Sequence, residues 1–487
     1  MNRMSKGNGK PKIRSVKFNV VMNMILTSSS FLFPLITVPY VSRVLGPSKT
    51  GIISWASTFT DYFILVAMLG FNMYGTRECA KVRDDREKLS QVLQELITIL
   101  LISTSIVYVV YLTFVFLTPR TQEQLPLMFI TGTTIWFTAA GAEWFYRAIE
   151  QYGYITFRNI LFKISSVVLM FIFVRQTQDY LAYAAINVLG TVGSNIINIC
   201  RLRKYVDFSI HRKLNIRHHF KSMLKFSVSS ISSGMYGKID MLLLGFFVNN
   251  YSLGLYQLVF KIRNLCTSVG GSVTAVMLPR LSYYEAKEGH EHTTHLMAEN
   301  FNFLLMIGLS MISAMVICAH PIIVLLGGTE YLPGSQALQI GAPLVLLGSI
   351  GSMQSQYMVA SNREKTYTYT TVFGLVFSVI LECILIPLWG INGAALGLVI
   401  TEFCVYLLRS YIIRDFMHAV HKYTDYCKIV LAWVIASIST IVMLWIVGSY
   451  NAFIQIALSG ATYLLVNFLL LYITKERFFI SVVKREK

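Results

Sequence analysis

Five positive charges stand inside otherwise apolar stretches of this chain, and they are the residues best placed to do chemistry. These embedded cations are Lys163, Lys225, Lys238, Lys261 and Arg263. A charge deep in an apolar helix is costly unless it faces water, a partner or a ligand. A lysine is a movable point charge, and an arginine can hold a phosphate or carboxylate through two parallel hydrogen bonds. The embedded cations therefore predict a binding site for an anion.

Lys238 and Lys261 lie on opposite sides of the short segment VNNY at 248–251, each about nine or ten residues from it. At ~1.5 Å per residue both reach a depth of ~15 Å, near the middle of a membrane. Asp240 and Arg263 lie two residues from them, and so on other faces of the same helices. Two interpretations stay open. A Lys–Asp or Arg–Asp bridge could simply lock the helices together, or the surplus positive charge could bind an anion.

Lys163 and Lys225 differ in depth. Lys163 is about ten residues into its apolar stretch, too far from either end to reach the surface comfortably, so anion binding and snorkelling remain as alternatives. Lys225 lies within a turn of a basic segment and is expected to anchor at the membrane interface.

Acidic residues are embedded as well, namely Asp61, Glu143, Asp240, Glu382 and Glu402. Asp61 and Glu402 are mid-stretch, where a carboxylate can pair with a cation or take up a proton, since burial raises a carboxyl pKa. The alternative for each is a hydrogen bond to a neighbouring helix. Glu143 is four residues from Arg147, which predicts an ion pair along one helix face.

The elements that carry these residues must be membrane-spanning helices. The chain has 487 residues, of which 55% are hydrophobic and 14% charged, whereas soluble proteins carry about 25% charged residues. A span needs roughly 20 apolar residues, and unpaired backbone groups are too costly in lipid for anything but a helix here. We predict an all-α polytopic membrane protein with about fourteen spans. These lie at 18–42, 51–76, 93–118, 125–149, 153–174, 179–200, 222–247, 251–279, 297–325, 335–360, 367–386, 390–413, 427–447 and 451–473.

The distribution of charge predicts the topology. Every second segment between spans is basic, and this set, counted together with the adjoining span ends, holds 33 of the 42 Lys and Arg residues. The other set holds only Arg43, Lys49, Arg120 and Arg175. By the positive-inside rule, both termini and the basic segments are cytoplasmic. The net charge of +18 then reflects topology rather than nucleic-acid binding.

The basic segment at 201–221 divides the chain into two similar halves. Lys17-Phe18 before one polar-dotted helix matches Lys225-Phe226 before another, which predicts parallel repeats. The predicted order is a basic tail (1–17), an N-lobe of six helices (18–200), the linker (201–221), a C-lobe of six helices (222–413), two further helices (427–473) and a second basic tail (474–487).

Gates and hinges are predicted near the first two spans. Arg43 is at the outer end of the first span, and Arg77, followed by Glu78, is at the inner end of the second. Each is a gate candidate, with plain lipid-headgroup contact as the alternative. Pro34 and Pro39 should interrupt hydrogen bonding in the first span and bend it, which predicts a hinge.

The outward loops are too short to hold a catalytic domain, so we expect no enzyme activity. The seven cysteines form no CxxC pair and lie in or at the ends of spans, which favours apolar packing over a disulfide framework or a metal site.

Two stretches resemble a known family. PYVSRVLGPSKTGIISWASTFTDYFILVAMLGFNMYGTRECAKVRDDREKLSQ, within 39–95, resembles the N-terminal signature of the Wzx-type polysaccharide-biosynthesis flippases, and WGINGAALGLVITEF at 389–403 is similar to their twelfth span. The resemblance implies the multidrug/oligosaccharidyl-lipid/polysaccharide exporter fold, with two six-helix lobes around a central cavity. It also implies flipping of an oligosaccharide on undecaprenyl diphosphate, by alternating access, across the bacterial plasma (inner) membrane.

The resemblance gives the candidate residues specific roles. The diphosphate would be bound by Lys163, Lys238, Lys261, Arg263 and, on the exit side, Arg43. Coupling or gating would fall to Asp61, Asp240, Glu402 and Arg77. No cofactor is expected apart from a coupling proton or sodium ion. The expected partners are the lipid-linked glycan, the bilayer, and the polymerase and glycosyltransferases of the same pathway.

Three alternatives remain. A MATE-like drug exporter shares the fold but typically has twelve spans and an acid-lined cavity. A polytopic polymerase or glycosyltransferase would need a larger external loop with catalytic residues. A structural scaffold would not need five embedded cations.

Overall fold

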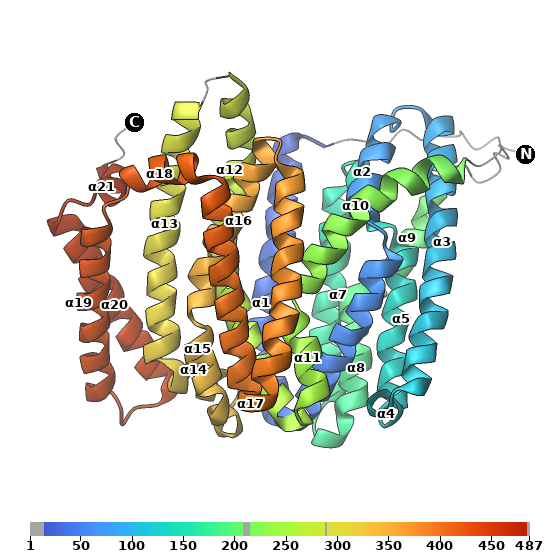
Figure 1. The fold of residues 1–487 in the computed structure, drawn as a ribbon. Coiled ribbons are helices and arrows are strands. Elements are labelled where there is room, and N and C mark those ends of the chain that lie inside the picture. Colours follow the sequence, from blue (N-terminus) through green and yellow to red (C-terminus); the bar gives the residue numbers. More distant parts are fainter. Residues whose placement is uncertain (1–13, 208–214, 288–289, 485–487) are drawn as a thin grey trace, which may run out of the picture. The chain divides into compact units, whose positions relative to one another are not determined.

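The chain folds into helices. A computed structural model describes the backbone of residues 14–207, 215–287 and 290–484, apart from the side chains at 16, 31, 225–226, 229, 272–293 and 481–484. The described residues form helices and no strands (Figure 1), which confirms the all-α class. Most of the predicted tail 1–17, part of the linker, the end of the second tail and the predicted anchor Lys225 lie outside the described residues or side chains.

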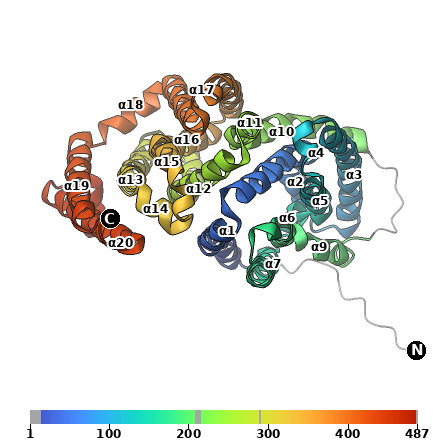
Figure 2. The same cartoon turned by 90° about the horizontal axis from the view of Figure 1, so that it is seen from below.

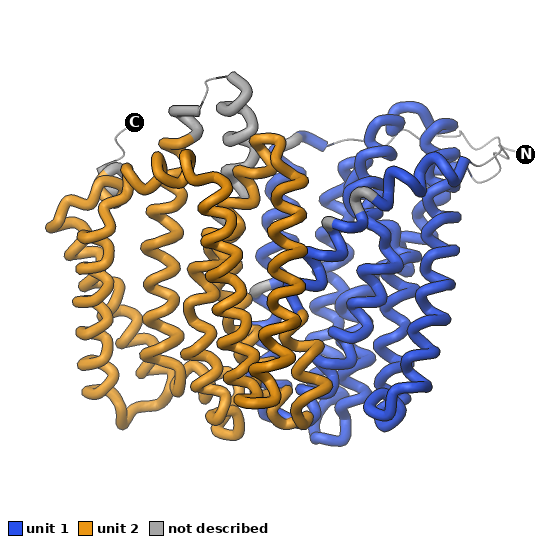
Figure 3. The backbone as a smooth tube through the Cα atoms, in the orientation of Figure 1, with its two compact units in different colours: residues 1–238 blue, residues 239–487 orange. Residues whose placement is uncertain are grey.

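The chain divides into two compact units, residues 1–238 and 239–487 (Figure 3). Unit 1 is built from helices that are mostly apolar along one face or all round. Its elements are α1 (Val16–Ala67), α2 (Phe71–Lys81), α3 (Arg86–Leu117), α4 (Pro119–Gln122), α5 (Leu125–Gly141), α6 (Glu143–Ala148), α7 (Tyr152–Phe173), η1 (Thr177–Asp179), α8 (Tyr180–Val188), the π-helical η2 (Leu189–Gly193), α9 (Asn195–Leu202) and α10 (Ile216–Tyr236).

Unit 2 has the same character. Its elements are α11 (Ile239–Phe247), α12 (Asn250–Lys287), α13 (His290–Ile317), α14 (Ala319–Leu326), η3 (Thr329–Gly334), α15 (Ser335–Gly341), α16 (Pro343–Ala360), α17 (Glu364–Ile412), α18 (Arg414–Lys422), α19 (Tyr426–Ile446), α20 (Ala452–Ile473) and α21 (Arg477–Lys484). Helices α19 and α20 lie side by side (Figures 1 and 2). Their outer faces expose large apolar side chains such as Trp445 (84% exposed) and Leu465 (72%), which suits a lipid environment.

Two very long helices are broken at glycines. α1 has 52 residues and departs from helical geometry at Gly46 (φ 70°, ψ 174°). α17 has 49 residues and departs at Gly390 (φ 56°, ψ −130°). Only glycine adopts these conformations without strain. Gly46 lies between the predicted spans 18–42 and 51–76, and Gly390 is the first residue of the predicted span 390–413, next to the predicted turn.

Other details differ from the expected spans. The predicted span 51–76 is not one continuous helix. Helix α1 ends at Ala67, because Leu69 (φ 39°) and Gly70 (φ 73°) leave the helical region of backbone dihedrals before α2 begins. The predicted span 222–247 is interrupted between Tyr236 and Ile239, so α10 belongs to unit 1 and α11 to unit 2.

The two candidate hinge prolines do not interrupt α1. Helical dihedrals continue through Pro34 and Pro39, and Gly46 is the residue of α1 with non-helical dihedrals. Removing one backbone donor in lipid is tolerated when the rest of the helix is held by its neighbours. The hinge role of the two prolines stays a prediction.

Several helices are long and apolar enough to cross a membrane. Nine of the described helices meet this description, or ten if the bent pair Thr329–Gly341 and Pro343–Ala360 is taken as one span. Helical backbone lies within every one of the fourteen predicted spans.

Candidate functional site

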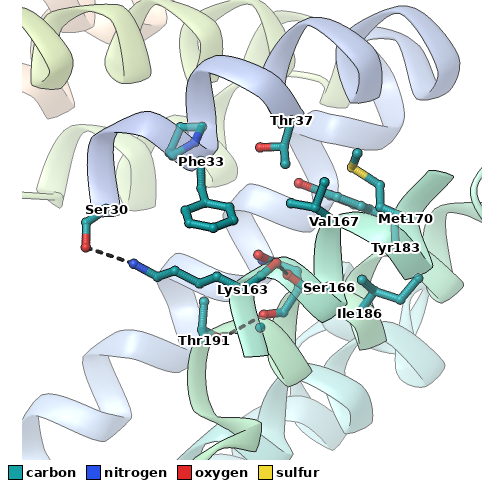
Figure 4. Close-up of a pocket in the computed structure, with 13 residues that line it drawn as sticks. Ser30, Phe33, Thr37, Lys163, Ser166, Val167, Met170, Tyr183, Ile186 and Thr191 are labelled. Carbon is teal, nitrogen blue, oxygen red and sulfur yellow. Dashed lines mark hydrogen bonds between the residues drawn. The ribbon is translucent and has the colours of Figure 1, made fainter. Parts of the chain in front are cut away.

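Unit 1 contains a cavity of about 300 Å³ around Lys163, called here the Lys163 pocket (Figure 4). Its walls come from α1, α7, α8 and η2. The lining residues are Ser30, Phe33, Pro34, Thr37, Lys163, Ser166, Val167, Met170, Tyr183, Ile186, Asn187, Gly190 and Thr191. A predicted site residue therefore lies in a real cavity with several polar groups.

Lys163 is held by hydroxyl groups rather than by an acid. Its Nζ donates to Ser29 Oγ and Ser30 Oγ, each at 3.0 Å, and lies 5.8 Å from the centroid of the Phe33 ring. No carboxylate among the described residues is within ion-pair distance of it. Because neutral hydroxyls cannot compensate a full charge in a half-buried site, the ammonium group remains able to bind an anion.

The backbone of the pocket is unusual at two points. A Cβ at Gly190 would lie 2.6 Å from Ser166 Oγ, so glycine allows η2 to approach α7 closely. Pro34 has no backbone N–H, so the carbonyl of Ser30 lacks its usual helical donor. π-Helical turns such as η2 occur often at functional sites.

Lys238 forms an ion pair with Asp61 within unit 1. The Nζ–Oδ2 distance is 2.6 Å, and the side chains are 42% and 39% exposed. Lys238 lies at the interruption between α10 and α11, and Tyr62 Oη donates to the Met235 carbonyl at 2.8 Å. The structure thus pairs Asp61 with one of the predicted anion-binding cations.

Arg263 forms a buried ion pair with Asp240 within unit 2. The Nη1–Oδ2 distance is 3.2 Å, and the side chains are 10% and 1% exposed. Tyr256 Oη donates to the same Oδ2 at 2.8 Å, and the Met241 N–H donates to Oδ1 at 2.8 Å. These contacts match the structural interpretation, an Arg–Asp bridge between the helices on either side of VNNY.

Two further acids lie near that bridge on α17. Glu382 is fully buried and accepts a hydrogen bond from Ser378 Oγ at 2.7 Å, while its Oε2 has no hydrogen-bond partner among the described residues. Glu382 interacts electrostatically with Asp240, and Glu402 does so with Arg263. Lys261, like Glu402, is half-buried.

The two gate candidates are both exposed, and Arg43 lies three residues before the break at Gly46, Arg77 four residues before the end of α2. Arg43 donates to the Pro39 carbonyl at 3.1 Å. Arg77 contacts its neighbour Glu78 at 3.1 Å, with half of its side chain exposed.

Sequence comparison decides the family. Residues 16–285, more than half of the chain, match the polysaccharide biosynthesis protein family. The chain belongs to this family. This confirms the resemblance seen at 39–95.

Relatives extend the match over most of the chain. A protein named as an O-antigen transporter in Escherichia coli K12 is 24% identical over 409 residues, covering 82% of this chain and 97% of that protein. A protein named as the low-salt glycan biosynthesis flippase Agl15 of Haloferax volcanii is 20% identical over 219 residues, 44% of this chain and 46% of that protein. These relatives carry the names of transporters and flippases, not of enzymes.

Solved structures show the fold. The lipid II flippase MurJ in an inward closed conformation has a TM-score of 0.72 at 15% identity, covering 94% of this chain and all of that one. An inward-facing MATE transporter of the MOP superfamily has a TM-score of 0.60 at 16% identity, over 83% and 99% of the two chains. This family member is therefore a multi-pass membrane protein with the MurJ- and MATE-like fold.

Two buried arginines of this polysaccharide biosynthesis protein were not predicted as embedded cations, because both lie close to span ends that are basic. Arg158 is 2% exposed and pairs with Glu143 at 3.0 Å, while Arg147 pairs with the same carboxylate at 2.7 Å, as predicted. Arg409 is 6% exposed and donates to Thr370 and Thr371 hydroxyls, each at 3.1 Å.

A buried polar network near the linker also escapes sequence reasoning. His219 on α10 contacts Tyr74 Oη through Nδ1 and Glu95 Oε2 through Nε2, both at 2.8 Å. Glu95 Oε1 also accepts from the Asn215 N–H at 2.8 Å. This network holds α10 against α2 and α3, and its three side chains are too far apart in sequence for any spacing rule to join them.

Proposed function

We propose that the chain is a flippase that moves oligosaccharide linked to undecaprenyl diphosphate from the cytoplasmic to the outer leaflet. The proposal places it in the bacterial plasma membrane with both termini cytoplasmic. The observation that carries it is the family match over residues 16–285. The relative named as an O-antigen transporter, which aligns over 82% of the chain, adds to it.

The proposal includes fourteen spans, arranged as two six-helix repeats plus α19 and α20, and transport by alternating access. The breaks at Gly46 and Gly390 support the count, because a straight 52-residue helix would be about 78 Å long against a ~30 Å hydrocarbon core. Lys238 lies at the interruption within the predicted span 222–247, and the charged side chains of that span lower its mean hydropathy.

Of the predicted diphosphate ligands, Lys238, Lys261 and Arg263 are assigned to the diphosphate, with Arg43 on the exit side, while Lys163 lines a pocket of its own. Lys238 is the leading candidate. Both side chains of the Lys238–Asp61 pair are accessible, so an incoming diphosphate can displace the carboxylate from Lys238. Arg263 would first have to leave a buried carboxylate, which is far more costly.

Coupling is assigned to Asp61 and Glu402, through a proton or a sodium ion, with Asp240 and Arg77 in gating and Pro34 and Pro39 as hinge points. Asp61 suits this role because it would be released each time substrate takes Lys238. Glu382 joins the coupling candidates, since a fully buried carboxylate with an unpartnered oxygen favours a bound proton or cation. Polymerase and glycosyltransferases of the same pathway are the proposed partners.

The second candidate function is a MATE-like drug exporter, favoured by the structural likeness to MATE transporters. The embedded cations argue against it, since a cationic drug would be repelled by them.

Reconstitution separates the two functions. Purified protein is placed in liposomes that carry a polyprenyl-diphosphate-linked oligosaccharide, and lectin binding measures its exposure on the far leaflet. We expect the native protein to accelerate exposure and Lys238→Gln to abolish the acceleration, while ethidium transport is absent from both. An imposed proton or sodium gradient tests the coupling ion. Ethidium transport without glycan exposure would refute the flippase and favour the exporter.

A further inference from the structure

The Lys163 pocket offers one positive charge and a wall of polar groups. Hydroxyl or amide groups come from Ser30, Thr37, Ser166, Tyr183, Asn187 and Thr191. Phe33 and Tyr183 add aromatic rings (Figure 4). A single ammonium group matches a ligand with one negative charge, because the second charge of a diphosphate would stay uncompensated in a half-buried site.

Three hydroxyl protons of this wall are committed to backbone carbonyls. Ser30 Oγ donates to the Leu26 carbonyl at 3.3 Å, and Ser166 Oγ donates to the Lys163 carbonyl at 2.7 Å. Thr191 Oγ1 donates to the Asn187 carbonyl at 2.8 Å. These three hydroxyls therefore turn lone pairs, and not protons, toward the cavity.

These three acceptor oxygens favour a ligand that brings its own hydrogen-bond donors. An ionised phosphate has only acceptor oxygens, so it would satisfy Lys163 and then meet lone pairs on Ser166 and Thr191. A sugar ring has several O–H groups that can donate to such oxygens, and an apolar face that packs on an aromatic ring. The cavity of about 300 Å³ is large enough to hold one sugar ring.

We propose that the Lys163 pocket binds a single acidic sugar, a hexuronate-type ring with one carboxylate, from the transported glycan. The carboxylate accepts from Lys163 Nζ, and ring hydroxyls donate to Ser166 and Thr191. Asn187 supplies an amide that can serve either kind of partner. This inference rests on the proposed function and deepens it: the glycan of this transporter contains a negatively charged sugar, and the pocket selects for it.

Direct binding tests the pocket without translocation. Saturation-transfer NMR on the purified, detergent-solubilised protein measures the binding of glucuronate and of glucose, with inorganic phosphate and pyrophosphate added as competitors. We expect glucuronate to bind about tenfold more tightly than glucose, because a charge-assisted hydrogen bond is stronger than a neutral one. Phosphate and pyrophosphate should not displace glucuronate. Displacement by either would overturn the proposal in favour of a phosphate site, and equal affinity for the two sugars would overturn it outright.

Three variants and a control sharpen the test. Lys163→Gln should abolish the preference, so that glucuronate and glucose bind with about equal affinity. Lys163→Arg should keep the preference for glucuronate. Asn187→Leu should weaken glucuronate and glucose alike and leave their ratio unchanged. Lys204→Gln, at an exposed lysine of the same unit, should change nothing. If Lys163→Gln fails to fold, an altered ratio in Asn187→Leu or a lost preference in Lys163→Arg would still refute the assignment.

The binding test of the pocket and the liposome test of the proposed function can fail independently of each other. Protein that prefers glucuronate but does not expose lipid-linked glycan in liposomes would keep the pocket and refute the flippase. Protein that flips the glycan without preferring glucuronate would keep the flippase and refute the pocket.

Discussion

Charged residues embedded in this protein form two kinds of ion pair, and burial separates them. Asp240 is 1% exposed and pairs with Arg263, whereas the side chains of Asp61 and Lys238 are 39% and 42% exposed. A buried carboxylate that loses its cation carries an uncompensated charge in a medium of low dielectric constant. An accessible pair loses little when one partner is neutralised. The same change of charge should therefore affect folding at one pair and transport at the other.

Arg263→Gln should lower stability by about 3–5 kcal/mol and reduce the amount of protein in the membrane. Lys238→Gln should cost about 0–1 kcal/mol and leave abundance normal while impairing transport. Thermal melting in detergent and immunoblotting of membranes measure both effects. The double variant Arg263→Gln/Asp240→Asn is the control, since removing both charges should restore most of the stability. Normal abundance of Arg263→Gln would contradict the structural bridge and return Arg263 to substrate binding.

At the scale of elements, the motif WGINGAALG shows why glycines recur at the turn within α17. Gly390 has φ 56° and ψ −130°, which other residues adopt only with strain. Three residues later, a Cβ at Gly393 would lie 2.0 Å from the Leu385 carbonyl oxygen. The chain thus reverses so tightly that its two arms meet backbone to backbone.

Gly393→Ala should be strongly destabilising, because a backbone carbonyl cannot move aside as the end of a side chain can. We expect a clear loss of monodisperse protein on size-exclusion chromatography and a lower melting temperature. Gly348→Ala is the matched control, since its nearest contact, Thr267 Cγ2, would lie at an ordinary 3.5 Å. Equal behaviour of the two variants would mean that the close approach at Gly393 is absent.

At the scale of the whole molecule, the charge pattern predicts which loops face the cytoplasm. In a variant without native cysteines, Phe208→Cys in the basic linker should react with a membrane-impermeant maleimide only after the cells are permeabilised. Tyr450→Cys, in the exposed turn between α19 and α20, should react in intact cells. Strong labelling at position 208 from outside would invert the predicted topology.

Much of this protein follows from local sequence. The all-α class, the breaks at Gly46 and Gly390 and the Glu143–Arg147 pair depend on residues close together in the chain. Apolar runs, glycine conformations and helical spacing act over a few residues, so these features can be predicted without the tertiary structure. The five embedded cations were identified for the same reason.

Tertiary structure alone decided what each embedded charge contacts. Lys238 and Asp61 are 177 residues apart, and Lys163 and Ser29 are 134 apart. Only packing brings such partners within hydrogen-bonding distance, and many pairings satisfy the same composition. It also distinguished a buried bridge at Arg263 from an accessible pair at Lys238, and revealed Arg158 and Arg409 as interior residues. Burial sets the energetic value of a charge, and burial is a property of the folded chain.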